Sequence, residues 1–178
     1  IFQCIYGERN ETGLLLIGDP KQAIYGFRGA DIHTYLRARS SAVQPTWTLD
    51  ANYRSTQSMV EAVNRVFGFA EQHPQGAFLF GKGDQGLPFL PVHAKGRKEC
   101  LQLHGQSMPA LQLAVTPDTT PISKSAYRTI MAEHAASTLV QWLNAAGHGD
   151  CGFVAVDGRF SALGPGDIAI LVRTGTEA

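Results

Sequence analysis

Residues 14–31 have the sequence Leu-Leu-Leu-Ile-Gly-Asp-Pro-Lys-Gln-Ala-Ile-Tyr-Gly-Phe-Arg-Gly-Ala-Asp. The four apolar residues at its start predict a short strand that is buried on both faces. Gly18, Asp19 and Pro20 end that strand, and polar and aromatic side chains follow on a loop. Asp31 can cap a helix that continues through Leu36. Because open α/β sheets bind ligands at the carboxyl ends of their strands, the loop is a candidate binding segment.

A second segment, residues 49–55, has the sequence Leu-Asp-Ala-Asn-Tyr-Arg-Ser. A short strand starting at 47–49 is expected to lead into it, and Ser55 can cap a helix whose apolar residues recur at helical spacing through Phe67. Further along, the patterns predict strands at 88–92, 101–103 and 111–115, a long helix over 127–146 closed by Gly147, a hairpin at Asp157-Gly158, and a buried strand at 167–172. Strands and helices are therefore both expected, as in an α/β protein.

Composition limits the possible classes of protein. The 178 residues are 44% hydrophobic and 17% charged, which is typical of a chain that can form a packed core. The net charge is zero, so nucleic-acid binding would need a local basic patch or a surface completed by other segments. The three cysteines, Cys4, Cys100 and Cys151, are not closely paired, which fits a reducing compartment. No run approaches the roughly 20 apolar residues that span a bilayer. We therefore expect a cytoplasmic protein with no membrane partner, and the first residue, Ile1, suggests a piece of a longer chain.

The loop after the first predicted strand carries side chains with two possible roles each. The amide of Gln22 can donate to a phosphate oxygen or orient an attacking water, or it can simply face solvent. Tyr25 and Phe27, beside Arg28, can form a stacking platform for single-stranded bases, or their rings can pack into the core. Arg28 can pair with a phosphate or with a structural carboxylate.

The second segment leaves a similar choice. Arg54 at the end of a strand can reach the terminal phosphate of a nucleotide held by another lobe, and Tyr53 can stack on a purine. The alternative is a surface arginine beside a half-buried tyrosine. The cysteines and six histidines lack the short paired spacing of a zinc site, so no metal site is expected within the chain.

Together, the two segments resemble motifs III and IV of the UvrD/RecB-type DNA helicases of superfamily one. Pro20 and Lys21 are similar to the RecB-type members, the beta subunits of exodeoxyribonuclease V. The resemblance implies partial RecA-like P-loop NTPase lobes: residues 1–45 as the C-terminal part of the first motor lobe, and residues 46–178 as the N-terminal part of the second, with a family-specific insertion.

The resemblance also implies roles for individual residues. Gln22 would sense the γ-phosphate and Arg54 would be the arginine finger, so these two are the implied catalytic residues. Tyr53 would stack on adenine and complete the ATP contacts. The implied DNA contacts are Tyr25, Phe27 and Arg28, with Phe27 standing where tryptophan is common in UvrD-type members.

The implied activity is that of an ATP-dependent DNA helicase and exonuclease subunit that unwinds DNA in double-strand-break repair and recombination. ATP and Mg²⁺ would be its cofactors, and single-stranded DNA, duplex DNA and RecC- and RecD-like subunits its partners. The chain contains no G-x-x-x-x-G-K-[ST] phosphate loop and no Asp-Glu pair, so most phosphate contacts and the Mg²⁺ ligands would lie outside it. On its own the chain is expected to be inactive. The alternative is a non-catalytic DNA-binding or scaffold module derived from such a helicase.

One further segment imitates a family motif. Residues 92–96, Val-His-Ala-Lys-Gly, resemble the His-x-x-Lys-Gly core of motif V. However, the segment follows motif IV too closely, and the family's Leu-Glu after the glycine is replaced by Arg97-Lys98. These differences argue against motif V at residues 92–96.

Overall fold

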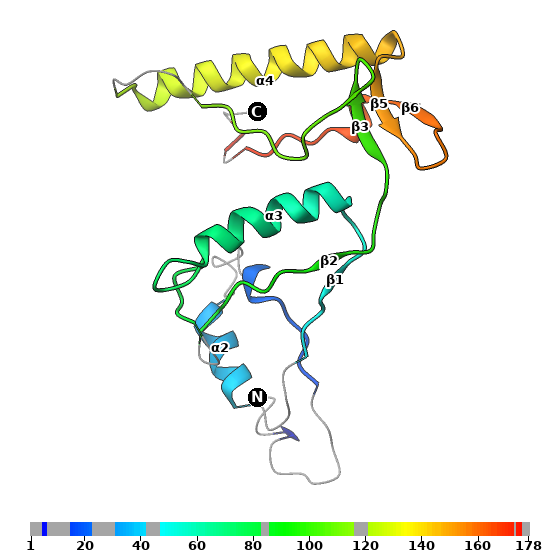
Figure 1. Ribbon diagram of the computed structural model, residues 1–178. Helices are drawn as coiled ribbons and strands as arrows, with labels where there is room; N and C mark the ends of the chain where they lie inside the picture. The colour runs from blue at the N-terminus through cyan, green and yellow to red at the C-terminus, as the bar shows by residue number, and fades with distance from the viewer. Residues whose placement is uncertain are drawn as a thin grey trace. The chain divides into compact units, whose positions relative to one another are not determined.

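The computed structural model describes residues 5–6, 15–22, 31–41, 47–82, 86–115, 121–172 and 174–175. The chain divides into two compact units: unit 1 contains Ile1–Thr48 and Ala70–Phe89, and unit 2 contains Leu49–Phe69 and Leu90–Ala178. Helices and sheets are both present, which confirms the predicted mixed α/β class (Figure 1).

Unit 1 is built from a short 3-10 helix η1 (Pro20–Gln22), helix α2 (Ile32–Ser40) and the loops that follow Ala70. The predicted cap at Asp31 is confirmed, because its carboxylate accepts hydrogen bonds from the backbone amides of His33 (2.9 Å) and Thr34 (3.1 Å). These bonds satisfy donors that the first turn of a helix otherwise leaves unpaired. The helix continues beyond the expected Leu36 to Ser40.

The loop that closes unit 1 is organised by Glu71. Its Oε2 atom accepts hydrogen bonds from the backbone amides of Ala77 (2.8 Å) and Phe89 (3.1 Å), so one carboxylate joins two distant parts of the loop. These two backbone hydrogen bonds lower the pKa of Glu71 below its ordinary value, because they stabilise its charged form. The Glu71 carboxylate therefore satisfies two backbone amides of a segment that has no regular secondary structure to pair them.

This arrangement predicts an acid-sensitive loop. Because the folded-state pKa of Glu71 is lowered, its contribution to stability is present above the unfolded pKa and is lost as the pH falls below about 4.5 and through the folded value. Glu71→Gln should lower the melting temperature at neutral pH and remove part of its acid dependence, as measured by thermal unfolding from pH 7 to 3. Glu133→Gln on the exposed face of α4 (Lys124–Gly147) is the control. Equal pH profiles for the Glu71→Gln variant and the unaltered protein would contradict this role.

Unit 2 begins with a parallel strand pair and a helix. Strand β1 (Ala51–Asn52) pairs with β2 (His93–Ala94), in the register Ala51 opposite His93 and Asn52 opposite Ala94. Helix α3 (Gln57–Ala70) follows β1 and buries Val60. The helix is confirmed, but the side-chain cap lies at Thr56 rather than Ser55, since Thr56 Oγ1 accepts from the amide of Met59 at 3.4 Å.

A four-stranded antiparallel sheet forms the rest of unit 2, in the order β4-β3-β5-β6. Its strands are β3 (Cys100–Leu103), β4 (Gln106–Ser107), β5 (Cys151–Val154) and β6 (Phe160–Ala162). The predicted strand at 101–103 and the hairpin between β5 and β6 are confirmed, with Gly158 at φ +82° in the turn. That positive φ favours glycine.

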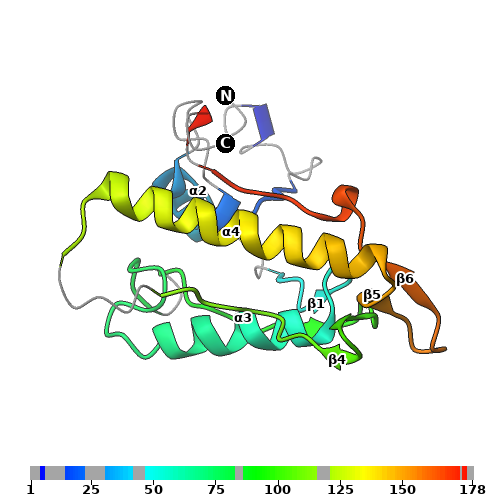
Figure 2. The same ribbon diagram turned by 90° about the horizontal axis from the view of Figure 1, so that it is seen from above.

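Helix α4 packs on this sheet only near its carboxyl end (Figure 1). The predicted helix is confirmed and its amino end is capped by Ser123, whose hydroxyl accepts from the amide of Ala126 at 3.1 Å. The core contains Ala145, Ala146, Cys151 and Leu163, with Trp142 packed against it. The apolar face predicted for the whole helix is thus buried only over its last turns, and Figure 2 shows its long continuation away from the sheet.

Several predicted strands are wrong. Residues 15–19, 47–50, 87–92, 108–115 and 168–172 have no regular secondary structure, although four of these segments contain apolar runs. Leu15 and Ile17 are 82% and 90% exposed and Leu171 is 98% exposed, so they are not buried strands. A strand needs a partner strand, and none of these segments pairs with one within the described part of the chain. The strand expected from residue 47 is confined to Ala51–Asn52.

Candidate functional site

Gln22 lies on an exposed turn that Asp19 holds in place. The carboxylate of Asp19 accepts hydrogen bonds from the backbone amide of Lys21 (3.0 Å) and from Nε2 of Gln22 (3.1 Å). It also forms an ion pair with Nζ of Lys21 at 3.1 Å. The backbone amide of Gln22 donates to the Asp19 carbonyl, at 3.0 Å, and completes η1. The side chain of Gln22 is thus oriented by its neighbour while the residue stays exposed.

The electrostatics of this turn favour an ionised Asp19. Partial burial alone would raise its pKa, but the hydrogen bonds from Lys21 and Gln22 and the charge of Lys21 together lower the pKa below its ordinary value. At neutral pH the turn therefore presents a carboxylate whose charge Lys21 compensates locally. The sequence carries a signal for this role, because an aspartate directly before a proline is typical of the start of a helical turn.

Tyr53 and Arg54 lie on a turn between β1 and α3. The side-chain oxygen of Asn52 accepts hydrogen bonds from the backbone amides of Arg54 and Ser55, both at 2.9 Å. An asparagine that bonds to amides two and three residues on fixes a tight turn. Tyr53 is 71% exposed, and Arg54 is exposed too. Among the residues that the structure describes, the Arg54 guanidinium forms no ion pair, so this charge is available to a ligand.

The structure brings Tyr53 and Arg54 together and places Gln22 in the other unit. The three predicted DNA-contacting residues, Tyr25, Phe27 and Arg28, lie outside the described residues. The two flanks of their segment are described: η1 ends at Gln22, and the cap of α2 is Asp31. Their roles remain predictions.

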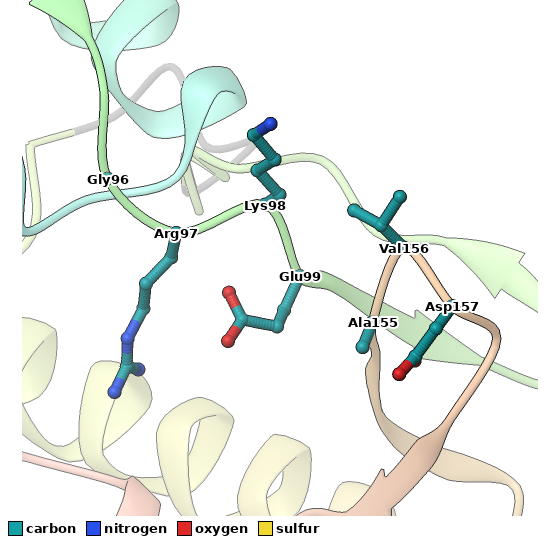
Figure 3. Close-up of a pocket in the computed structure, with 7 residues that line it drawn as sticks. All are labelled: Gly96, Arg97, Lys98, Glu99, Ala155, Val156 and Asp157. Atoms are coloured by element: carbon teal, nitrogen blue, oxygen red, sulfur yellow. The ribbon is translucent and has the colours of Figure 1, made fainter.

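A pocket that the sequence did not predict lies next to the start of β3. It has a volume of about 520 Å³ and is lined by residues 96–99 and 155–157. In Figure 3, Arg97 and Lys98 point to different sides of the chain, and Glu99 points into the opening beside the β5–β6 turn. The Oε2 atom of Glu99 is buried and has no hydrogen-bond partner in the described part of the chain. Charges of both signs line the pocket, since Arg97 and Lys98 are basic and Glu99 and Asp157 are acidic.

Within the described ranges, no group of three or more histidine, cysteine, aspartate or glutamate side chains could hold a metal ion. None of the described helices combines the length and apolarity needed to cross a bilayer.

Comparisons with known proteins agree with the two motif segments. Residues 1–42 match the family model of the UvrD/REP helicase N-terminal domain. Along its whole length, the chain is 38% identical over 180 residues to the RecBCD enzyme subunit RecB of Escherichia coli (strain K12), and 37% identical to that of Haemophilus influenzae. The RecB subunit of Mycobacterium tuberculosis (strain ATCC 25618 / H37Rv) is 56% identical over 55 residues, or 31% of the chain.

These matches confirm that the chain resembles the UvrD/RecB-type helicase family, as the two motif segments indicated. The chain is similar to RecB subunits from its first residue to its last, at 30–38% identity for five of them. The chain spans about 14% of the length of these relatives.

Proposed function

We propose that the chain is the motif III and motif IV portion of a RecB-type subunit, an ATP-dependent DNA helicase and exonuclease that unwinds DNA in double-strand-break repair and recombination. The observation that carries this proposal is similarity to RecB subunits over the full chain, combined with exposed polar turns at both motifs. Residues 1–45 would complete the first RecA-like lobe. Residues 46–178 would begin the second.

ATP would be contacted by three residues of this chain. Gln22 would contact the γ-phosphate, Arg54 would stabilise charge on the transferring phosphoryl group, and Tyr53 would stack on adenine. The chain's own features fit such a ligand: an ordered amide, a guanidinium without an ion pair in the described part, and an exposed ring. Mg²⁺ would be held by residues outside the chain, because its sequence contains no Asp-Glu pair or phosphate loop.

The DNA contacts would come from the loop between η1 and α2. Tyr25 and Phe27 would stack on bases of a single strand and Arg28 would pair with its phosphates. Since the net charge of the chain is zero, these contacts would be local. In the cell we expect a cytoplasmic complex with RecC- and RecD-like subunits, as the name of the RecBCD relatives suggests.

The proposal is tested with Gln22→Ala in the full-length protein. If Gln22 couples phosphate sensing to DNA, the unwinding rate should fall by about 10²-fold, the order of magnitude for loss of one preorganised hydrogen-bond donor. Single-strand affinity without nucleotide should fall no more than that. Gln141→Ala on the exposed face of α4 is the matched control. Normal unwinding by Gln22→Ala would contradict the coupling role. Absence of DNA-stimulated ATP hydrolysis in the unaltered full-length protein would favour the non-catalytic module instead.

A further inference from the structure

Gly96 touches the backbone of the turn that carries Tyr53 and Arg54. A Cβ atom added at Gly96 would lie 2.6 Å from both the carbonyl carbon and the carbonyl oxygen of Tyr53, and 2.8 Å from the carbonyl oxygen of Ser55. These are backbone atoms, which cannot move aside as a flexible side chain can. Only glycine permits this close approach of two chain segments. Any side chain at residue 96 must therefore displace the turn.

Two backbone hydrogen bonds hold Gly96 in this position. The amide of His93 donates to the carbonyl of Asp50 at 2.7 Å, and the amide of Lys95 donates to the carbonyl of Asn52 at 2.8 Å. They belong to the parallel pairing of β1 with β2. Lys95 directly precedes Gly96, and Asn52 directly precedes Tyr53. The hydrogen bond between Lys95 and Asn52 therefore keeps the two segments in register up to the contact between Gly96 and Tyr53.

Helix α3 fixes the other side of β2 through Asn64. Its Nδ2 atom donates to the carbonyl of Val92 at 2.8 Å, and its Oδ1 atom accepts from the amide of Val92 at 3.3 Å. An amide side chain that bonds to both polar groups of one residue imitates a neighbouring strand. Because α3 also begins directly after the turn, Asn64 ties the segment that supports the turn to the helix that follows it.

We propose that Gly96 and Asn64 are positioning residues. They hold the backbone of the turn in place and thereby set the direction in which Arg54 and Tyr53 project. This inference rests on the proposed function, because it assigns a role in the reach of Arg54 toward a nucleotide phosphate. The inference also assigns a role to residues 92–96. In place of a motif V function, these residues would support the turn of motif IV.

The test is Gly96→Ala in the full-length protein, with Gly68→Ala on α3 as the matched control, since a Cβ there meets nothing within 4 Å. Misplacement of a catalytic group by about 1 Å can cost about 10²-fold in rate. The kcat for DNA-stimulated ATP hydrolysis should therefore fall by about 10²-fold in Gly96→Ala and stay unchanged in Gly68→Ala. In the absence of nucleotide, hydrogen exchange at the amides of Arg54 and Ser55 should accelerate in Gly96→Ala alone.

A double variant separates positioning from a general loss of structure. If Gly96 acts through Arg54, adding Gly96→Ala to Arg54→Ala should lower kcat no further, since residues that act as a unit are non-additive. A further drop, or wild-type turnover and exchange in Gly96→Ala, would overturn the inference. Normal turnover in Arg54→Ala would instead overturn the proposed function. If Gly96→Ala does not fold, Asn64→Ala is tested instead, because it removes both hydrogen bonds to Val92 without adding an atom. Wild-type kcat in Asn64→Ala would then overturn the positioning role.

Discussion

Arg54→Ala in the full-length protein should lower the kcat for DNA-stimulated ATP hydrolysis by about 10³–10⁵-fold, the range known for loss of an arginine finger. Nucleotide affinity should change little, because the finger acts on charge that develops in the transition state. The structural basis is a guanidinium on a turn whose backbone is fixed by Asn52, with no ion pair in the described part of the chain to hold it elsewhere. Turnover and nucleotide binding are measured on the same preparation.

Two variants sharpen this experiment. Arg54→Lys keeps the charge but not the planar fork of donors, and should recover only part of the rate. Arg65→Ala removes an exposed arginine from α3 in the same unit and should leave kcat unchanged. Near-normal turnover in Arg54→Ala would remove the finger assignment.

The chain on its own should show no ATP hydrolysis at all. Its 178 residues contain no phosphate loop and no Asp-Glu pair, so Gln22 and Arg54 have no triphosphate held opposite them. Affinity for single-stranded DNA should also be weak even at low salt, because a net charge of zero provides no broad attraction to phosphates. The measurements are steady-state ATPase assays with and without DNA, a single-strand titration, and light scattering to follow self-association through the exposed apolar segments.

Contaminating ATPases are the usual difficulty in such an assay, and Arg54→Ala in the same chain controls for them. Turnover that persists in both forms comes from a contaminant. Turnover by the purified chain that Arg54→Ala abolishes would contradict the prediction and with it the assignment of the chain to parts of two lobes.

The helices were predictable because their signals are local. Asp31 and Ser123 cap their helices through side-chain bonds to nearby amides, and Gly147 ends α4 as the sequence indicated. The β5–β6 hairpin was predictable for the same reason, since Asp157-Gly158 specifies a turn at short range. The side chains of Asn52 and Asp19 likewise accept hydrogen bonds from backbone amides close in the sequence, so these turn-forming signals are also local.

The strands were less predictable because a strand depends on a partner elsewhere in the chain. The apolar runs at 14–17, 88–92, 111–115 and 167–172 have the composition of strands, yet their described residues form no strand pair within the part of the chain that the structure describes. The short strand β2 was missed for the opposite reason: His93 and Ala94 have no strand pattern, and only the neighbouring β1 makes them one. Gly96 could not be recognised either, because its contact with Tyr53 appears only after the two strands are paired.

The parallel pairing of β1 with β2 also affects how unit 2 folds. Ala51 and His93 are separated in the sequence by α3 and the loop after it. Pairing two very short strands therefore requires the chain to close a long loop. Helix α3, whose contacts are local, can form before that closure, and the strand pair comes later. For the same reason, the β1–β2 pair is expected to open before α3 unfolds, which makes it a point of local opening in the native protein. The turn that holds Arg54 can therefore loosen while α3 stays helical, and anything that binds the closed form would slow its opening.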